Sequence, residues 1–266
     1  MSIFQAIFLG LIQGFTEFVP VSSSGHLILA HHFFNITTTG LAFDVALHLG
    51  TLGALLIYFH KDAWKLLKSL FVKSQETRLA WLLIMATLPA VVVGFLLEKP
   101  AETAFRSPRL VAINLTIGAI LMLLAERYYQ LRVKKPTKLD NVTRKQALIM
   151  GLSQAAAVIP GISRSGSTIT AGVFVGIDRV AATRFSFLLG IPITAGAILK
   201  VFTQAGTLQQ LSDGRTVFIA GIVTAFLSGL FAIRFLLRFL ARHSLAVFAY
   251  YRLALSTLVL ILLVLQ

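Results

Sequence analysis

The chain has 266 residues, of which 57% are hydrophobic and only 13% are charged. A mean hydropathy of +0.84 exceeds what the surface of a water-soluble chain of this length can carry, so the composition excludes a soluble enzyme. The absence of cysteine excludes disulfides, thiolate metal sites and a cysteine nucleophile, while the formal net charge of +14 must be located along the chain before it can be interpreted.

The first apolar segment, residues 4–32, is interrupted near its middle by VPVSSSGH. Backbone polar groups at membrane depth need protein or water as partners, so this segment cannot be a lipid-facing helix. It predicts a re-entrant helical hairpin, with a pair of short interfacial helices as the alternative. Gln13 and Glu17, four residues apart, share one face of the entering helix. A charge inside a membrane segment costs about 2.5–3.5 kcal/mol, so Glu17 is expected either to act in a site or to pair with Arg164.

The interruption itself carries several chemically active groups. Ser22, Ser23, Ser24 and His26 supply three hydroxyls and an imidazole within five residues. They provide a potential nucleophile and a group that titrates near neutral pH. The alternative is a Ser-Gly loop that merely caps a helix.

Six apolar stretches have the length of about 17–25 residues that a hydrocarbon core of roughly 30 Å requires. They are residues 43–60, 79–97, 109–126, 184–203, 216–236 and 246–265. In the first stretch, Asp44 and His48 are also four residues apart, and we interpret them as a helix-entry aspartate and a packed histidine. No loop is long enough for a soluble nucleic-acid-binding domain, so nucleic acid is not expected as a partner.

A second broken segment, residues 146–176, lies between the third and fourth stretches and contains PGISRSGST. Its polar residues Ser163, Arg164, Ser165, Ser167 and Thr168 directly precede a predicted helix. Hydroxyls, a guanidinium and free N–H groups at a helix N-terminus are the groups that bind an oxyanion such as phosphate. Arg164 is permanently charged, so at membrane depth it needs either Glu17 or an anionic ligand.

The two broken segments are related by a constant offset in the sequence. Gly10, Leu11, Gln13, Ser22, Ser24 and Gly25 correspond to Gly151, Leu152, Gln154, Ser163, Ser165 and Gly166. Each hairpin is followed by three spans, and a unit with three crossings returns its successor to the membrane inverted. The sequence therefore predicts an all-α polytopic membrane protein with six transmembrane helices and two re-entrant hairpins in an inverted-topology repeat. It forms one membrane domain over 1–266, with repeats at 1–130 and 146–266 and a cytoplasmic linker at 131–145.

The basic residues are distributed unequally between the two sides of the predicted spans. Of the 24 Lys and Arg residues, 18, including Arg252, fall on one side, five on the other, and Arg164 in the second hairpin. The positive-inside rule assigns the richer side to the cytoplasm. Both termini are then extracytoplasmic, and the first hairpin, with its candidate site, opens to the extracytoplasmic face.

The combination of QGFTEFVPVSSSGH in the first broken segment with PGISRSGST in the second resembles the undecaprenyl-diphosphate phosphatase family, bacterial membrane proteins associated with bacitracin resistance. The resemblance extends over essentially the whole chain and includes FDVALHLGT and FSFLLGIP. It implies a multi-pass protein of the bacterial plasma membrane. It also implies hydrolysis of undecaprenyl diphosphate to the monophosphate and inorganic phosphate, which recycles the lipid carrier of peptidoglycan synthesis.

The resemblance also implies roles for particular residues. The family's acidic motif falls on Gln13 and Glu17, its serine-histidine segment on Ser23 and His26, and its PGxSRSxxT motif on Pro160–Thr168. Many relatives have Glu where this chain has Gln13, and an amide is neither a base nor a strong ligand for a hard cation. A mechanism that needs two carboxylates is therefore in doubt for this chain.

We expect a metal-assisted diphosphatase in which Mg²⁺ or Ca²⁺ binds with Glu17. The residues expected to be catalytic are Glu17, Ser23, His26 and Arg164, and those expected to bind substrate are Gln13, Ser22, Ser163, Arg164, Ser165 and Thr168. Ser23, His26 and water all remain candidates for the nucleophile.

A transporter or flippase of an anionic lipid or small anion is the alternative function, because inverted repeats with broken helices are typical of alternating access. The expected partners are a polyprenyl diphosphate and membrane lipid, and a homodimer stays open.

Overall fold

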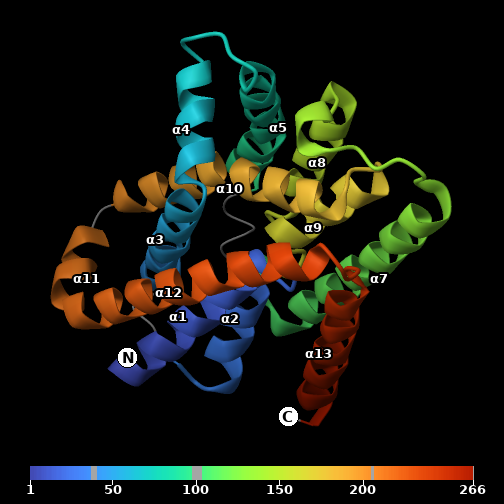
Figure 1. Ribbon diagram of the computed structural model, residues 1–266. Helices are drawn as coiled ribbons and strands as arrows, with labels where there is room; N and C mark the ends of the chain where they lie inside the picture. Colours follow the sequence, from blue (N-terminus) through green and yellow to red (C-terminus); the bar gives the residue numbers. More distant parts are fainter. Residues whose placement is uncertain (37–40, 98–103, 205–206, 266) are drawn as a thin grey trace.

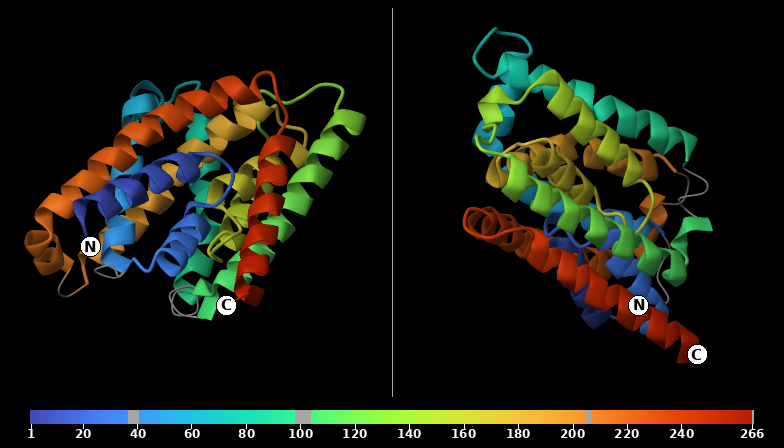
Figure 2. Two further views of the ribbon diagram at one scale, coloured as in Figure 1. Left: turned by 90° about the horizontal axis from the view of Figure 1, so that it is seen from below. Right: turned by 90° about the vertical axis from the view of Figure 1, so that its right-hand side faces the viewer.

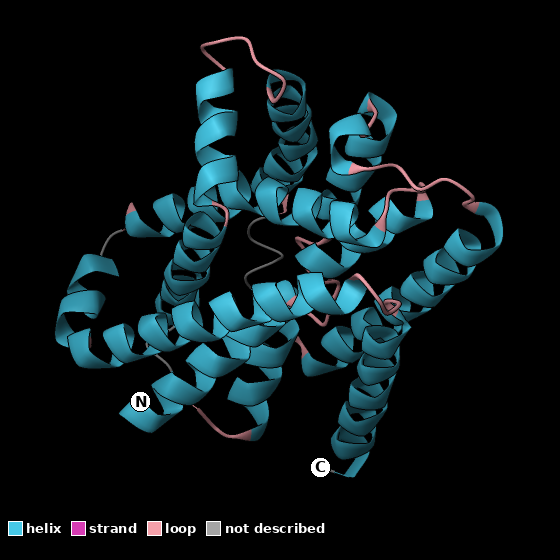
Figure 3. Cartoon of the chain, viewed as in Figure 1, coloured by secondary structure: helices cyan, strands magenta, loops and turns pink. Residues whose placement is uncertain are grey.

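The computed structural model describes residues 1–36, 41–97, 104–204 and 207–265, and this part of the chain contains helices and loops but no strand (Figures 1 and 3). The longer helices are α1 (Ile3–Phe18), α2 (Ser23–Phe33), α3 (Leu41–Tyr58), α4 (His60–Ser69), α5 (Thr77–Leu96), α7 (Pro108–Arg132), α8 (Arg144–Ala156), α9 (Arg164–Phe174), α10 (Arg179–Phe202), α11 (Thr207–Asp213), α12 (Arg215–Leu240) and α13 (Ala246–Leu265).

The helices α3, α5, α7, α10, α12 and α13 correspond to the six predicted apolar stretches, although α3, α5 and α10 end one or two residues earlier. By length and composition, five of them could cross a membrane, and α3 joined to α4 across an 80° bend would make a sixth. The all-helical class and the five to six candidate spans are therefore confirmed, whereas the bend after Tyr58 was not predicted. The chain is a multi-pass membrane protein by these criteria.

The two broken segments fold into helix–loop–helix units with the same local geometry. The first joins α1 to α2 and the second joins α8 to α9, and each second helix is preceded by a serine with positive φ: Ser22 at 79° and Ser163 at 77°. The Ser22 hydroxyl accepts a hydrogen bond from the N–H of Gly25, and the Ser163 hydroxyl accepts one from the N–H of Gly166. Side-chain capping therefore stabilises an unusual backbone conformation in both units.

Pairwise helix packing positions the two units against the spans. The helix α1 lies along α12 and also contacts α3, while α8 lies along α5 and α9 contacts α7 and α10. Phe18, the last residue of α1, packs edge-to-face on Phe187 of α10 with ring centroids 5.3 Å apart. This contact fixes the C-terminal turn of α1, and with it Glu17, beside α10.

Arg252 is not a loop residue, although the sequence analysis counted it on the cytoplasmic side. It lies inside α13 and is 1% exposed. Its Nε donates to the carbonyl of Leu115, and its Nη2 lies within hydrogen-bonding distance of the carbonyls of Asn114, Gly161 and Ile162. Without Arg252 the richer side loses one basic residue, so the charge bias between the two sides keeps its sign.

The two termini lie on the side of the molecule away from the connection between α4 and α5, as Figures 1 and 2 show. This arrangement is the one expected for a chain that crosses a layer an even number of times. Both termini lie on one side whichever side of the membrane faces the cytoplasm.

Candidate active site

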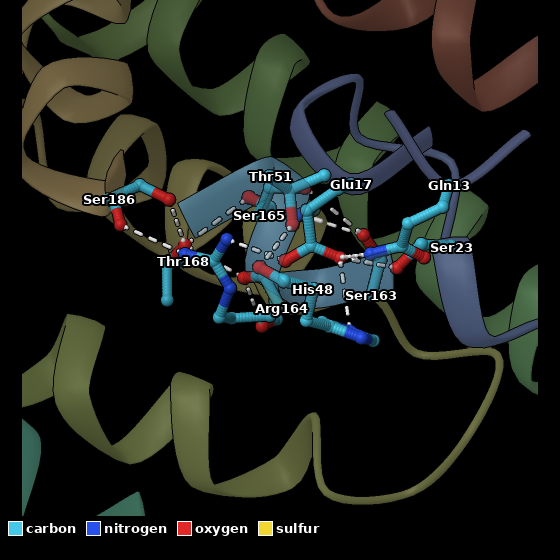
Figure 4. Close-up of polar contacts among 12 residues, drawn as sticks. Gln13, Glu17, Ser23, His48, Thr51, Ser163, Arg164, Ser165, Thr168 and Ser186 are labelled. Atoms are coloured by element: carbon cyan, nitrogen blue, oxygen red, sulfur yellow. Dashed lines mark hydrogen bonds and ion pairs between the residues drawn. The ribbon is translucent and has the colours of Figure 1, made fainter. Parts of the chain in front are cut away.

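Four helices bring polar side chains together around the carboxylate of Glu17 (Figure 4). Glu17 is 7% exposed, and its Oε1 accepts a hydrogen bond from Arg164 Nη2 at 2.8 Å. Its Oε2 accepts from Ser23 Oγ at 2.6 Å and from Gln13 Nε2 at 3.2 Å. The structure therefore joins the polar residues of both hairpins, and the pair between Glu17 and Arg164 that the sequence analysis considered is formed.

Ser23 and Arg164 reach Glu17 from equivalent positions in the two broken segments. Ser23 is the first residue of α2 and Arg164 is the first residue of α9, and the two positions are related by the offset that relates the two hairpins. Both side chains leave the N-terminus of their helix toward the same carboxylate. Gln13 reaches Glu17 from one turn earlier on α1.

Arg164 is held by its surroundings as well as by Glu17. Its side chain is 13% exposed, and its Nη1 donates to the carbonyl of Ser186 in α10 at 3.3 Å. Gly190, one turn further along α10, leaves the space that the guanidinium occupies, because a Cβ atom there would collide with Nη1. The glycine of the FSFLLGIP segment is thus a contact of the site.

The other hydroxyls of the second hairpin are engaged within the hairpin and with α10. Thr168 Oγ1 lies 2.8 Å from the carbonyl of Arg164 and 2.6 Å from Ser186 Oγ, and Ser165 Oγ lies 3.4 Å from Ser163 Oγ. These contacts shape the first turn of α9. The first N–H groups of a helix have no intrahelical partner, so this turn still presents donors to an anion.

His26 lies next to the site without touching Glu17. Its Nδ1 is 2.7 Å from the carbonyl of Ser22, which identifies Nδ1 as the protonated nitrogen, and its Nε2 is 2.8 Å from the Tyr251 hydroxyl. The two rings also stack with centroids 5.7 Å apart. Tyr251 was not singled out from the sequence, because nothing in the apolar pattern of α13 shows which of its faces meets α2.

His48 is a further site residue that the sequence analysis assigned to packing. Its Nε2 lies 3.8 Å from Glu17 Oε2, and its side chain is 28% exposed. Asp44, by contrast, belongs to a separate cluster in which it contacts His31 at 2.9 Å and Arg106 at 3.0 Å. Of the two residues spaced four apart, His48 therefore lies at the site and Asp44 does not.

A divalent cation would find few protein ligands here. No group of three or more His, Cys, Asp or Glu side chains suited to a metal occurs in the described part of the chain. Glu17 contributes one carboxylate, and the buried Gln13 Oε1 accepts no hydrogen bond from any described residue. Mg²⁺ typically takes one or two carboxylates together with substrate phosphates. The donor set therefore fits a cation shared with a phosphate ligand.

The arrangement combines a hydroxyl that donates to a carboxylate with a guanidinium on the same carboxylate. Ser23 and Arg164 both contact Glu17, which brings together a hydroxyl, a carboxylate able to accept its proton and a guanidinium able to bind an anion. This is the set that acyl or phosphoryl transfer through a serine requires.

Comparison with known proteins matches residues 6–258 to the family model described as "Bacitracin resistance protein BacA". The chain is 46% identical to "Undecaprenyl-diphosphatase" from Moorella thermoacetica over 261 residues, covering 97% of each protein. It is 43% identical to the protein of the same name from Rubrobacter xylanophilus over the full length of both. A third, from Pelotomaculum thermopropionicum, is 42% identical over 98% of this chain and 97% of that protein.

Proposed function

Because this chain belongs to the bacitracin resistance protein BacA family, we propose that it hydrolyses undecaprenyl diphosphate to undecaprenyl phosphate and inorganic phosphate. The observation that carries the assignment is the contact of Ser23, Glu17 and Arg164, which supplies the groups needed to cleave a phosphoanhydride. The reaction regenerates the lipid carrier of peptidoglycan synthesis. It also lowers the lipid diphosphate available to bacitracin, which accounts for the resistance in the family's name.

In the first step, Ser23 Oγ attacks the terminal phosphorus. The new Oγ–P bond forms as the bridging P–O bond breaks, undecaprenyl phosphate leaves with the bonding electron pair, and the Ser23 proton passes to Glu17. The 2.6 Å contact supports this role, since a general base must lie within hydrogen-bond reach of the proton it takes. Arg164 offsets the charge on the terminal phosphate.

In the second step, water attacks the phosphorus of the phosphoserine and gives up a proton; the Oγ–P bond breaks, inorganic phosphate is released, and Ser23 Oγ takes back the proton that Glu17 holds. His26 is assigned as the acceptor of the water proton, because it lies three residues after Ser23 and therefore on the same side of α2. Ser22, Ser163, Ser165 and Thr168 act on the substrate by fixing the first turns of α2 and α9, whose N–H groups face the phosphates.

Glu17 and Gln13 Oε1 would hold Mg²⁺ or Ca²⁺ together with phosphate oxygens. The chemistry that such a cation supplies is neutralisation of charge on the diphosphate. The buried, unpartnered Gln13 Oε1 supports this assignment. Gln13 thus replaces the second carboxylate of many relatives by a neutral oxygen ligand.

For the architecture, the proposal is six spans and two re-entrant hairpins in an inverted repeat, as one domain with repeats at 1–130 and 146–266. A further parallel supports it: Ser2 with Gln5 and Thr143 with Gln146 form capping boxes at the start of α1 and α8, again at equivalent positions of the repeat. Both termini would be extracytoplasmic in the bacterial plasma membrane, and the site would open to that side. A homodimer is compatible with this arrangement.

An anionic-lipid flippase is the second candidate. The matched geometry of the two hairpins favours it, because antiparallel units around a central site are typical of alternating access. A protein that combines both activities would use the same site.

The deciding experiment measures phosphate release by purified protein from a long-chain prenyl diphosphate, with and without a chelator. The proposal expects turnover that the chelator suppresses and that Ser23→Ala abolishes. A Ser24→Ala variant is the matched control, since Ser24 Oγ contacts Ser22 Oγ and not Glu17. Lipid movement across vesicles without phosphate release would favour the flippase.

A further inference from the structure

A cavity of about 470 Å³ lies between α7, α8 and α9. Most of its lining is apolar and includes Leu121, Leu124 and Phe174. These three side chains are 55%, 57% and 49% exposed on the outer surface of the helices. The cavity is therefore bounded by side chains that also meet the hydrocarbon around the protein.

The polar residues of its lining are Ser153, Ser167, Thr170 and Arg252. Arg252 lies at the end of the cavity beside Gly118 and Gly166, away from Leu124 and Phe174 along α7 and α9. The hydrogen bonds of Arg252 are made by Nε and Nη2, and its Nη1 has no hydrogen-bond partner in the described part of the chain. No carboxylate in that part pairs with Arg252 either. A buried, permanently charged group with carbonyl contacts alone is suited to an anionic ligand.

Arg252 adjoins the hairpin that carries Arg164. Arg252 Nη2 is bound to the carbonyls of Gly161 and Ile162, immediately before Ser163 and Arg164. Gly166 also lines the cavity, and a Cβ atom there would lie 3.0 Å from Arg252 Nη1. The first turn of α9 thus has Arg164 on one flank and Arg252 on the other.

We propose that this cavity binds the first part of the polyprenyl chain, with Arg252 facing the phosphate to which the chain is attached. The inference rests on the proposed diphosphatase function. An apolar cavity with one cationic end matches a hydrocarbon chain with one anionic end, and the N-terminus of α9 lies between Arg164 and Arg252. Arg164 would then bind the terminal phosphate and Arg252 the phosphate that leaves with the lipid.

The absence of native cysteine allows a direct binding test. Leu121 lines the cavity, while its neighbour Ile120 is 48% exposed on the same helix and does not. The rate of maleimide labelling of Leu121→Cys and Ile120→Cys in detergent is measured with a C20 prenyl methylenediphosphonate, whose P–C–P bridge resists hydrolysis. We expect at least about fivefold slower labelling of Leu121→Cys and no change for Ile120→Cys.

Three ligand controls identify the source of protection. Methylenediphosphonate without a chain should protect neither variant, and phosphatidylglycerol at equal concentration should not protect Leu121→Cys. Equal protection by phosphatidylglycerol, or equal protection at both positions, overturns the proposal. In the Leu121→Cys background, Arg252→Gln should remove the protection and Arg252→Lys should retain part of it; unchanged protection in Arg252→Gln contradicts the role of Arg252.

Hydrolysis by the wild-type protein is measured separately. Hydrolysis without protection of Leu121→Cys overturns the cavity assignment and leaves the proposed function intact. Protection without hydrolysis overturns the proposed function and leaves the cavity assignment intact, because the protein would then bind the lipid diphosphate without cleaving it.

Discussion

Glu17 accepts hydrogen bonds from donors that come from three different helices, and His48 of a fourth lies 3.8 Å away. Removing any one donor therefore leaves the carboxylate with remaining partners, whereas removing the carboxylate releases all of them. Loss of Glu17 is therefore expected to disturb the site more than loss of any one of its donors. Substitutions at Arg164 and at Glu17 test different parts of the proposed reaction.

We expect Arg164→Lys to lose at least about tenfold in kcat/KM, about 1.4 kcal/mol of transition-state stabilisation, in a protein that still folds and inserts. An ammonium is a point charge and cannot donate to Glu17, to the Ser186 carbonyl and to phosphate in one plane, as a guanidinium does. Steady-state phosphate release measures the effect. Retention of more than half of the wild-type rate would exclude a phosphate-clamping role.

Glu17→Gln should reduce kcat by about 10²–10⁴-fold, because it removes the proton acceptor of Ser23. The response to added Mg²⁺ or Ca²⁺ should disappear from the residual activity, since both acidic-motif positions then carry amides. Gln13→Glu is the reciprocal variant and should lower the cation concentration needed for half-maximal activity. An unchanged cation response in Glu17→Gln would place the metal elsewhere.

Gly190→Ala should impair catalysis through Arg164, because the added methyl group occupies the position of the guanidinium. We expect a loss of about tenfold in kcat/KM, or about 1.4 kcal/mol. Gly196→Ala, further along the same helix, has no neighbour within 4 Å and should be neutral or stabilising by about 0.5–1 kcal/mol. Equal activity of the two variants would show that Arg164 can be displaced without cost.

At the scale of the helices, the apolar pattern predicted the candidate spans with ends that differ from the helix ends by up to six residues. The stretch predicted at 79–97 is α5 at Thr77–Leu96, for example. The 80° bend between α3 and α4 was not predictable, because the chain after Tyr58 keeps helical spacing and contains neither proline nor glycine there. Bends of this kind depend on what the helix packs against.

The same limit applies to the site. Gln13, Glu17, Ser23 and Arg164 were predictable because polar residues inside apolar segments are costly and therefore conspicuous. The contact of His48 with Glu17 depends on how α3 is aligned along α1, and the spacing of residues within α3 does not predict that alignment. Arg252 was misassigned because it lies only a few residues inside the last apolar stretch, where a basic residue also suits a cytoplasmic helix end.

Helix α7 is connected to two other elements through Glu126, which is 3% exposed. It pairs with Arg179 at the start of α10 and accepts from the N–H of Leu245 before α13. We expect Glu126→Gln to lower the free energy of unfolding by about 3–5 kcal/mol, because it leaves a partly buried guanidinium without its counter-charge. Thermal melting in detergent measures the loss.

The control for that variant is Asp62→Asn. Asp62 pairs with Arg184 across a contact whose two side chains are 40% and 39% exposed. An exposed pair contributes at most about 1 kcal/mol, so this variant should melt close to the wild type. If both variants lose the same stability, burial is not what makes the Glu126 pair important.

At the scale of the whole molecule, the repeat places a hydroxyl and a guanidinium at equivalent positions and uses both on one carboxylate. Ser23 and Arg164 are related by the offset of the repeat, whereas the position equivalent to Glu17 is Val158. The symmetry of the backbone is thus retained while the side chains have diverged.

The orientation of this repeat in the membrane is the last prediction, and it follows from the basic residues. After Arg252 is assigned to the interior, most of the Lys and Arg residues still lie on one side of the spans, so the connection between α4 and α5 should be cytoplasmic.

Gln75 lies in that connection, and Gln204 lies between α10 and α11; both side chains are exposed. Single Gln75→Cys and Gln204→Cys variants can be labelled in intact cells with a membrane-impermeant maleimide, because there is no native thiol to remove. Thr38, which follows α2 in the chain, would test the same side as Gln204 but lies outside the described residues. We expect Gln204→Cys to react and Gln75→Cys to react only after the cells are permeabilised. The reverse pattern would turn Ser23 toward the cytoplasm, and labelling of both in intact cells would mean that the protein inserts in two orientations.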